Sequence, residues 1–264
     1  MRILVTNDDG INAPGLAVLE KIAATLSDEV WVCAPEAEQS GASRALTLSE
    51  PLRVREIGLR RFAVLGTPTD CVMLAIENLM GEARPDLVLS GVNRGMNVAE
   101  DVTMSGTVAG AIEAMSLGVP AIALSQRMRY GPTDNVAPFE VAETFGAGLV
   151  ARLVELGWPN EVILNINFPA GSAKEVSEVE VTRQGFRDVL TRYAERRTDL
   201  LGRDYYWLGF RLADQAPAEG TDLRAADEGR ISVTPLHIDL THMPTVRQLA
   251  GVVGGPPPRL KAPA

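Results

Sequence analysis

Short, uninterrupted apolar runs alternate with helix-like segments through the first half of this 264-residue chain. Each run ends in a polar or Gly/Pro-rich turn, and the segments between runs repeat apolar residues at helical spacing, as Leu16, Leu19 and Ile22 do. The runs occupy residues 3–5, 30–33, 62–65, 87–89 and 121–124. Continuous apolar strands that alternate with helices are typical of a parallel sheet covered on both faces. We therefore expect the α/β class, with a Rossmann-like, mostly parallel sheet and helices on both of its faces.

The character of the chain changes after about residue 187. Residues 192–204 are highly charged, residues 205–207 are Tyr-Tyr-Trp, and residues 231–234 have the composition of a strand. This part resembles an extended arm more than a second self-sufficient core. We expect a Rossmann-like catalytic domain over residues 1–187, followed by a β-rich C-terminal oligomerisation arm with a loose tail over 188–264.

The charged residues exclude one large class of partner. The chain carries 25 Lys and Arg against 34 Asp and Glu, so its formal net charge is 25 − 34 = −9. Binding to long nucleic acid needs a basic surface that displaces counterions, and an acidic chain does not supply one.

The scarcity of histidine and cysteine narrows the possible chemistry. Two His and two Cys provide at most one zinc site, and their positions have no finger-like spacing. Two cysteines do not make a disulfide framework, which favours a reducing compartment. No stretch approaches the roughly 18 apolar residues of a membrane span, and the N-terminus becomes acidic too early for a signal peptide. We expect a cytoplasmic protein without a membrane segment.

Two adjacent carboxylates, Asp8 and Asp9, follow the first apolar run within the sequence Asn-Asp-Asp-Gly. Inside a strand they would point to opposite faces, but where the chain turns at a strand end both can reach one hard cation. Two like charges held close together cost free energy unless a cation or hydrogen-bond donors compensate. Taken alone, the tetrapeptide is more typical of an ordinary Asp-Gly turn with solvated acids.

Three further polar segments follow later runs. Residues 36–43 combine hydroxyl groups with a glycine and leave backbone N–H groups for a ligand, although such loops are more often plain connections. Residues 90–97 offer Asn carbonyl oxygens that suit Mg²⁺ or Mn²⁺, and a structural turn is the competing interpretation. Residues 105–107 open a helix, where they cap the N-terminus, bind a phosphate group, or do both.

The four polar segments are informative because of their common position. In a doubly wound sheet, ligands bind beyond the carboxyl ends of the strands, which is where these segments lie. Together they supply carboxylates, amide oxygens, hydroxyls and a helix N-terminus. This combination predicts a single hard metal ion beside a phosphate group.

Two other patterns are poor candidates for function. Residues 146–151 match the Gly-x-Gly-x-x-Ala dinucleotide fingerprint, but they lie inside an apparent helix with no strand directly before it. Close helix packing explains these small residues better. His237 and His242 are far in sequence from the polar segments, so we expect structural roles for both and no histidine-based acid–base catalysis.

A series of longer motifs, specific in order and spacing, covers most of residues 1–125 and recurs as far as about residue 242. They lie at residues 5–10, 13–15, 34–35, 39–43, 66–72, 85–93, 105–108, 164–167 and 232–236. With these motifs the chain resembles the SurE (survival protein E) 5′-nucleotidase family.

The resemblance implies a Rossmann-like, divalent-metal-dependent phosphatase that releases phosphate from nucleoside monophosphates. Carried over by position, one Mg²⁺ or Mn²⁺ per subunit would be held by Asp8, Asp9, Ser40 and Asn93. The phosphate side would be lined by Asn97, Ser105, Gly106 and Thr107, and the catalytic residues would be Asp8, Asp9, Asn97, Ser105 and Thr107. The family also exchanges a C-terminal arm between subunits, which implies a homodimer or homotetramer.

Two positions depart from the family pattern. Met104 stands where an aromatic residue is expected, and Ala99 stands where a glycine is common. Neither is a proposed ligand, but both can reshape the nucleotide pocket, so the resemblance does not define a preferred base.

Two alternative functions are compatible with acids at a strand end. An aspartyl-phosphate phosphatase or a DxD glycosyltransferase usually has its carboxylates two positions apart, whereas Asp8 and Asp9 are adjacent. A non-catalytic module that binds a nucleotide or a metal would bind its ligand without releasing phosphate.

Overall fold

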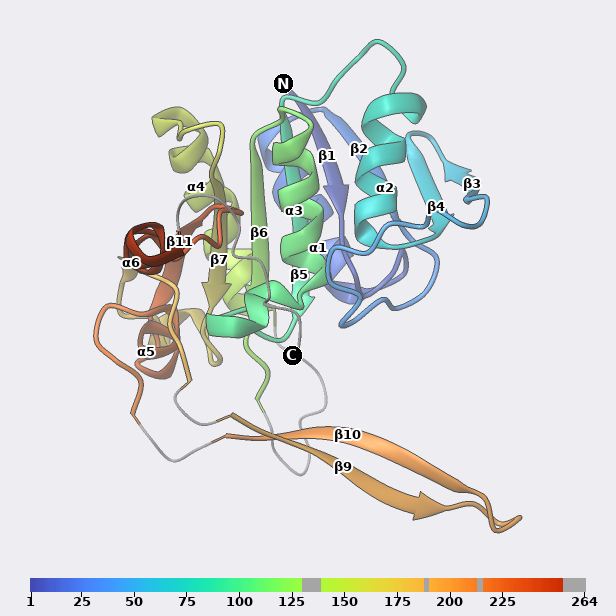
Figure 1. Cartoon of the computed structure of the whole chain (residues 1–264). Coiled ribbons are helices and arrows are strands. Elements are labelled where there is room, and N and C mark those ends of the chain that lie inside the picture. Colours follow the sequence, from blue (N-terminus) through green and yellow to red (C-terminus); the bar gives the residue numbers. More distant parts are fainter. Residues whose placement is uncertain (130–138, 188–189, 213–215, 254–264) are drawn as a thin grey trace, which may run out of the picture.

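A nine-stranded sheet forms the centre of the computed structural model, which describes residues 1–129, 139–187, 190–212 and 216–253 (Figure 1). The strand order is β3-β4-β2-β1-β5-β6-β7-β11-β8. The strands are β1 (Arg2–Thr6), β2 (Glu29–Pro35), β3 (Arg53–Gly58), β4 (Arg61–Leu65), β5 (Leu87–Arg94), β6 (Ala121–Gln126), β7 (Ile163–Phe168), β8 (Val179–Val181) and β11 (Ile231–Leu236). The run from β4 to β7 is parallel throughout, which confirms the predicted fold class.

Helices cover both faces of this sheet. The α-helices are α1 (Pro14–Leu26), α2 (Pro68–Leu74), α3 (Gly106–Ser116), α4 (Glu140–Leu156), α5 (Asp222–Asp227) and α6 (Met243–Val253). A π-helical turn, η1 (Ala75–Leu79), continues α2, and two 3₁₀ turns are η2 (Ala99–Thr103) and η3 (Ala173–Glu175).

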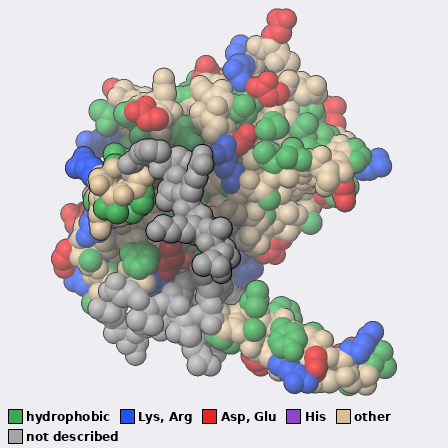
Figure 2. Space-filling model, in the orientation of Figure 1, with side chains coloured by type: hydrophobic (Ala, Val, Ile, Leu, Met, Phe, Trp, Pro, Cys, Tyr) green, Lys and Arg blue, Asp and Glu red, His purple; other side chains and the backbone are tan. Residues whose placement is uncertain are grey.

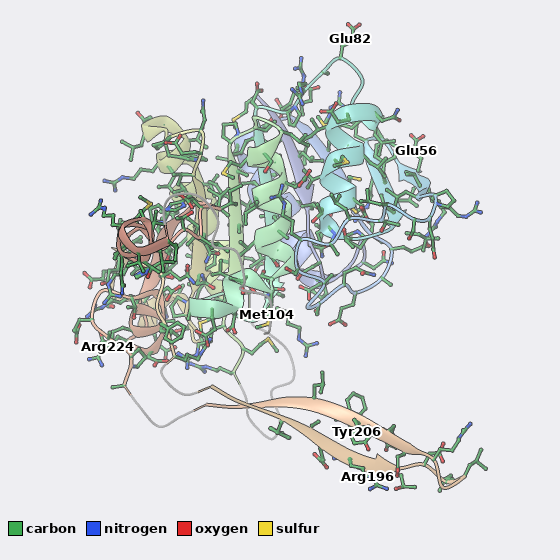
Figure 3. All side chains as sticks on the ribbon, in the orientation of Figure 1. Glu56, Glu82, Met104, Arg196, Tyr206 and Arg224 are labelled. Carbon is green, nitrogen blue, oxygen red and sulfur yellow. The ribbon has the colours of Figure 1, made fainter. Side chains whose placement is uncertain are left out.

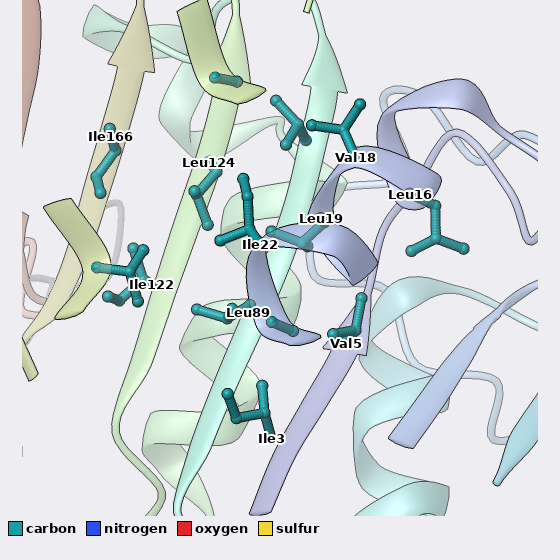
Figure 4. Packing of buried hydrophobic residues seen from close by; sticks show 14 of the residues in the cluster. Ile3, Val5, Leu16, Val18, Leu19, Ile22, Leu89, Ile122, Leu124 and Ile166 are labelled. Carbon is teal, nitrogen blue, oxygen red and sulfur yellow. The ribbon is translucent and has the colours of Figure 1, made fainter. Parts of the chain in front are cut away.

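The alternation of side chains along β1 divides the core into two layers. Ile3 and Val5 pack with residues of α1 and α4, including Leu19 and Ile22 (Figure 4). Leu4, between them in sequence, packs on the opposite face with residues of α2 and α3. Successive residues of a strand point to opposite faces, so a strand that is apolar at every position has to be covered twice.

Two glycines allow unusually close packing of helices. A Cβ atom at Gly110 of α3 would lie 3.0 Å from Ser90 Oγ and 3.2 Å from Thr6 Cγ2, so α3 packs closely on β1 and β5. A Cβ atom at Gly146 of α4 would lie 2.5 Å from Ile22 Cδ1 of α1. The dinucleotide-like pattern at 146–151 therefore includes a helix-packing position, as its context predicted.

The C-terminal part is less arm-like than expected from the sequence. A two-stranded antiparallel hairpin, β9 (Leu190–Thr198) and β10 (Asp204–Leu212), projects from the body (Figures 1 and 2). By contrast, β11 lies within the main sheet, antiparallel to β7 and parallel to β8. Its first four residues are buried, and such a strand needs neighbours on both sides. The body thus extends well beyond residue 187, and the described projecting part is the β9–β10 hairpin.

The chain changes direction across the sheet between β1 and β5. From β1 the chain proceeds to β2 on one side, and from β5 it proceeds through α3 to β6 and β7 on the other. This is the topological switch point, where the loops after β1 and β5 diverge and leave a crevice for ligands.

Candidate active site

Asp8 lies at the carboxyl end of β1, against the N-terminus of α3. The Thr107 hydroxyl donates a 2.6 Å hydrogen bond to Asp8 Oδ1. A Cβ atom at Gly106 would lie 2.8 Å from Asp8 Cβ and 2.9 Å from Asp8 Oδ2, so only a glycine permits this approach of the helix backbone. Asp8 is 4% exposed. The acidic pair and the helix N-terminus predicted from separate motifs therefore meet in one place.

Asp9 faces the loop that follows β5. The backbone N–H of Arg94, the last residue of β5, donates a 3.0 Å hydrogen bond to Asp9 Oδ2, which brings the preceding residue, Asn93, near the acidic pair in space. Burial and then the charge of Asp8 raise the pKa of Asp9 to about 6, although the hydrogen bond from Arg94 opposes the shift. Burial also raises the pKa of Asp8, against the hydrogen bond from Thr107.

The raised pKa values of Asp8 and Asp9 mean that ionising both neighbouring acids costs free energy, which is typical of a functional site. Glu38 adds to this charge and raises the pKa of both Asp8 and Asp9. A divalent cation would relieve the repulsion, and carboxylate, amide and hydroxyl oxygens are the ligands that hard cations prefer. Within the described ranges, no group of three or more His, Cys, Asp or Glu side chains could hold a metal ion. A cation site here would therefore need neutral oxygen ligands beside Asp8 and Asp9.

Ser40 and Asn93, the neutral ligands implied by the family resemblance, each donate a side-chain hydrogen bond to a residue two positions away in the chain. The backbone N–H of Gln39 donates to the backbone oxygen of Asp8 at 2.7 Å, so the Ser40 loop lies next to the acidic pair. The Ser40 hydroxyl itself donates to Glu38 Oε1 at 2.8 Å. The Asn93 side chain donates from Nδ2 to the backbone oxygen of Gly95 at 2.9 Å.

Asn7 has an unpaired polar atom beside these groups. Its Nδ2 donates to the backbone oxygen of Gly10 at 2.9 Å, while its buried Oδ1 has no hydrogen-bond partner among the described residues. Buried polar atoms in proteins are almost always paired, so an orphaned oxygen next to Asp8 fits a site that holds a further group.

The phosphate-side residues Asn97 and Ser105 have clear structural partners. Ser105 is the N-cap of α3, and its hydroxyl accepts a 3.0 Å hydrogen bond from the backbone N–H of Val108. The Asn97 amide donates from Nδ2 to Ser125 Oγ at 2.8 Å. The predicted capping role of Ser105 is therefore observed, and it leaves the first N–H groups of α3 directed toward the end of β1.

Asn165 and Asn167, which lie in the motif at residues 164–167 but had no role predicted from the sequence, hold the backbone of Asn97. Its N–H donates to Asn167 Oδ1 at 2.8 Å, and its carbonyl oxygen accepts from Asn165 Nδ2 at 2.7 Å and Asn167 Nδ2 at 3.1 Å. The sequence contains a pattern that could have indicated this pair, because Asn165 and Asn167 alternate with apolar residues and so share one face of β7.

The loop between β2 and β3 is fixed by two buried carboxylates. Glu113 of α3 pairs with Arg44 at 2.8 Å and is 4% exposed. Asp70, the N3 residue of α2, accepts hydrogen bonds from Thr47 N, Thr47 Oγ1 and Thr67 N. These contacts hold the loop that carries Ser40 above the end of the sheet. The sequence did not indicate either anchor.

Met104 lies at the end of the molecule where β1 and β5 end (Figure 3). Its backbone oxygen accepts a 3.2 Å hydrogen bond from Ser43 N, and the Ser43 hydroxyl donates to the backbone oxygen of Thr103 at 2.8 Å. The Ser40 loop and the segment before α3 are therefore in contact, and Met104 stands at their junction. His242 pairs with Thr245 in the C-terminal part.

The fold and the site define a doubly wound α/β protein with an acidic site at its topological switch point, beside a helix N-terminus. The family model described as survival protein SurE matches residues 3–191, and the chain belongs to that family.

Close relatives cover nearly the whole chain. A 5′-nucleotidase SurE from Caulobacter vibrioides (strain NA1000 / CB15N) is 66% identical over 259 residues, which are 98% of each chain. A 5′-nucleotidase SurE from Phenylobacterium zucineum (strain HLK1) is 67% identical over 260 residues, 98% of this chain and all of the relative. The crystal structure of the SurE protein from Aquifex aeolicus superposes with a TM-score of 0.82 at 37% identity, covering 96% of this chain and 99% of that one.

Proposed function

We propose that this protein is a divalent-metal-dependent 5′-nucleotidase, which hydrolyses nucleoside monophosphates to a nucleoside and phosphate. One observation carries the proposal: the 2.6 Å hydrogen bond from Thr107 to Asp8 joins a buried acidic pair to the N-terminus of α3. Such a junction is suited to a phosphate group that is bound by a cation on one side and by helix N–H groups on the other. The names of the relatives support the same substrate class.

Asp8, Asp9, Ser40 and Asn93 would hold one Mg²⁺ or Mn²⁺ ion per subunit. When bound, the ion would supply Lewis-acid polarisation of the phosphoryl group and would lower the pKa of a water molecule. For Ser40, the hydroxyl oxygen keeps its lone pairs for the ion while its proton is donated to Glu38. For Asn93, the amide oxygen is the atom suited to the ion, since Nδ2 already donates to Gly95.

Asn97, Ser105, Gly106 and Thr107 would bind the phosphate. The N–H groups at the start of α3 are directed donors, and the positive end of the helix dipole favours the negative charge that develops on the phosphoryl oxygens. Glycine at 106 lets these donors approach the end of β1 closely. Asp9 and Glu38 are both candidates for the acceptor of the proton from the attacking water.

The experiment is a phosphate-release assay with AMP, GMP, CMP, UMP and other phosphomonoesters, in the presence of Mg²⁺, Mn²⁺ or a chelator. We expect release that depends on the divalent ion and is abolished by Asp8→Ala or Asp9→Ala. Asp28→Asn, an exposed acid at the other end of the sheet, serves as the control and should retain activity. Turnover that is unchanged by the chelator would exclude this mechanism.

The same assay distinguishes the alternatives. A phosphorylated aspartate trapped during turnover would indicate an aspartyl-phosphate enzyme. Nucleotide binding without phosphate release would indicate a non-catalytic binding module. The adjacency of Asp8 and Asp9 disfavours the aspartyl-phosphate enzyme. A module that only binds a metal ion would not need a helix N-terminus next to Asp8.

We also propose that the β9–β10 hairpin joins subunits into a homodimer or homotetramer. Its residues Tyr206, Trp207 and Leu208 are 60%, 60% and 81% exposed within a single chain, a large apolar area for a solvated hairpin (Figure 3). Size-exclusion chromatography with light scattering tests this. A monomeric wild-type protein at micromolar concentration would contradict it.

We extend the proposal to the location and the partners of the protein. No helix in the described ranges is long and apolar enough to cross a membrane. We propose a cytoplasmic enzyme that acts on small phosphorylated substrates and does not bind long nucleic acid, in keeping with its net charge of −9.

A further inference from the structure

Ala99, one of the two residues that depart from the family pattern, has a backbone conformation that alanine rarely adopts. Its φ is +53°, in the left-handed region that favours glycine. Ala99 is fully buried and is the first residue of η2, the turn that leads to the N-cap of α3. A conformation that the residue itself disfavours has to be held by its surroundings.

Both backbone polar groups of Ala99 are held by side chains from the C-terminal part of the chain. Asp222 Oδ2 accepts a 2.9 Å hydrogen bond from the N–H of Ala99. Gln184 Nε2 donates a 2.9 Å hydrogen bond to the carbonyl oxygen of Ala99. These partners are 123 and 85 residues away in sequence, so the turn is defined by tertiary contacts and not by its own residues.

Asp222 is itself fixed. It is fully buried at the start of α5, and its Oδ1 accepts hydrogen bonds of 2.8 Å from the N–H groups of both Gly185 and Leu223. A Cβ atom at Gly185 would lie 2.8 Å from Asp222 Oδ1, so glycine is required for this contact. The carboxylate therefore ties three separate backbone segments together.

The contacts continue from Ala99 to the phosphate side of the site. Arg187 pairs with Glu100 at 3.0 Å and with Asp101 at 2.7 Å. The carbonyl oxygen of Asp101 accepts hydrogen bonds from Met104 N at 2.9 Å and Ser105 N at 3.0 Å. Ser105 caps α3, whose second residue, Thr107, donates to Asp8.

We propose that Asp222 is a positioning residue that holds Ala99 in its left-handed conformation and thereby places Ser105–Thr107 for phosphate binding. This inference rests on the proposed function, in which those residues bind the phosphate group. Asp222 does not touch the reacting atoms. It acts through the turn, and it links the segment that leads into the β9–β10 hairpin to the start of α3.

The test compares Asp222→Asn with Asp227→Asn, a matched control on the same helix whose exposed carboxylate pairs with Arg127. Two affinities are measured for each variant: that for Mn²⁺ alone, and that for inorganic phosphate in the presence of Mn²⁺. We expect Asp222→Asn to weaken phosphate binding about tenfold or more, because small displacements of binding groups have large effects. Mn²⁺ affinity should change much less than phosphate affinity, since Asp9 is held by Arg94 and not by α3. Phosphate affinity equal to that of Asp227→Asn would overturn the proposal.

A second variant separates positioning from a general loss of structure. Ala99→Gly adopts a positive φ without help, so in this background Asp222→Asn should cost much less phosphate affinity than it does alone. An equal loss in both backgrounds would show that Asp222 does not act through Ala99. Gln184→Ala, at an exposed side chain, offers a milder disturbance of the same turn if Asp222→Asn folds poorly.

Amide hydrogen exchange of residues 99–107 distinguishes a failure of this proposal from a failure of the proposed function. Faster exchange there in Asp222→Asn, together with a wild-type protein that releases no phosphate, would support the link and reject the nucleotidase. An active wild type with unchanged exchange and unchanged phosphate affinity in Asp222→Asn would reject the link alone.

Discussion

Thr107 and Asp8 are joined by a 2.6 Å hydrogen bond although they lie 99 residues apart in the chain. Both are buried, and Asp8 follows the end of β1 while Thr107 is the second residue of α3, so the two elements meet at the switch point of the sheet. The hydroxyl stabilises the carboxylate, and the carboxylate keeps the start of α3 at the strand end. The stability of the fold and the geometry of the site therefore depend on one contact.

Replacing Thr107 by Val should affect both properties. The variant keeps the shape of the side chain but removes the donor, which leaves a buried carboxylate oxygen unpaired at a cost of about 1–3 kcal/mol. Urea unfolding measures this loss, and phosphate release should fall in parallel. Thr107→Ser keeps the hydroxyl and is the control. A Val variant with wild-type stability and activity would show that the hydrogen bond contributes nothing.

Gly106→Ala should damage the site more than the fold. The added Cβ would lie 2.8 Å from Asp8 Cβ, so either the helix or the carboxylate has to move. We expect phosphate release to fall by about a hundredfold, because a displacement near 1 Å is that costly, with a loss of stability of about 1–3 kcal/mol. Gly148→Ala is the matched control, since nothing lies within 4 Å of its added Cβ and alanine favours the helix. Comparable activity in the two variants would contradict the close approach of α3 to Asp8.

Binding of a divalent ion should release a proton near pH 6. Burial and the charge of Asp8 raise the pKa of Asp9 to about 6, so below that pH the ion has to displace a proton from Asp9. Affinity for Mn²⁺ should therefore fall roughly tenfold between pH 7 and pH 5 through this group alone. Titration calorimetry in buffers of different ionisation enthalpy measures the proton release. Asp9→Asn should bind the ion more weakly and without this pH dependence.

The metal-free protein should show the corresponding pH dependence of stability. The pKa of Asp9 is raised in the folded state from its ordinary value of 3.8 to about 6. For a raised pKa, the stabilising contribution is complete below the unfolded value and is lost as the pH rises through the folded value. The melting temperature should therefore fall between about pH 4 and pH 7 through this group. Asp9→Asn should flatten that part of the profile, and saturating Mn²⁺ should oppose the fall. A profile that rises over this range in wild type but not in Asp9→Asn would contradict the raised pKa.

The parallel core was predictable because its strands contain continuous apolar runs, such as residues 3–5, 87–89 and 121–124, which are typical of burial on two faces. The edge was not. The six residues of β3 are all exposed and include two arginines and a glutamate, so their strand conformation comes from pairing with β4 and not from a core-facing pattern. The place of β11 in the sheet depends on β7, about 65 residues earlier in the chain by the pairing of Val233 with Ile166, and no local pattern encodes that partner.

The site was predictable to the same extent. The positions of Asp8 and Asp9 at a strand end, and of Ser105 at a helix N-terminus, follow from local sequence. The contacts that fix these groups come from elsewhere: Asn165 and Asn167 hold Asn97, and Asp222 holds Ala99. Predicting these hydrogen-bond partners requires knowing which helices and strands are neighbours in the fold.

The glycines of α3 that bring the helix onto β1 and β5 have a consequence for how this enzyme family can be diversified. Because α3 is seated on the side chains of Thr6, Ser90 and Asp8, any larger residue at Gly106 or Gly110 would have to displace one of these neighbours. Positions with more room for other side chains are Met104, directly before the N-cap of α3, and the exposed part of the loop between β2 and β3. A directed-evolution library would therefore keep Gly106 and Gly110 constant and randomise Met104 and the loop between β2 and β3.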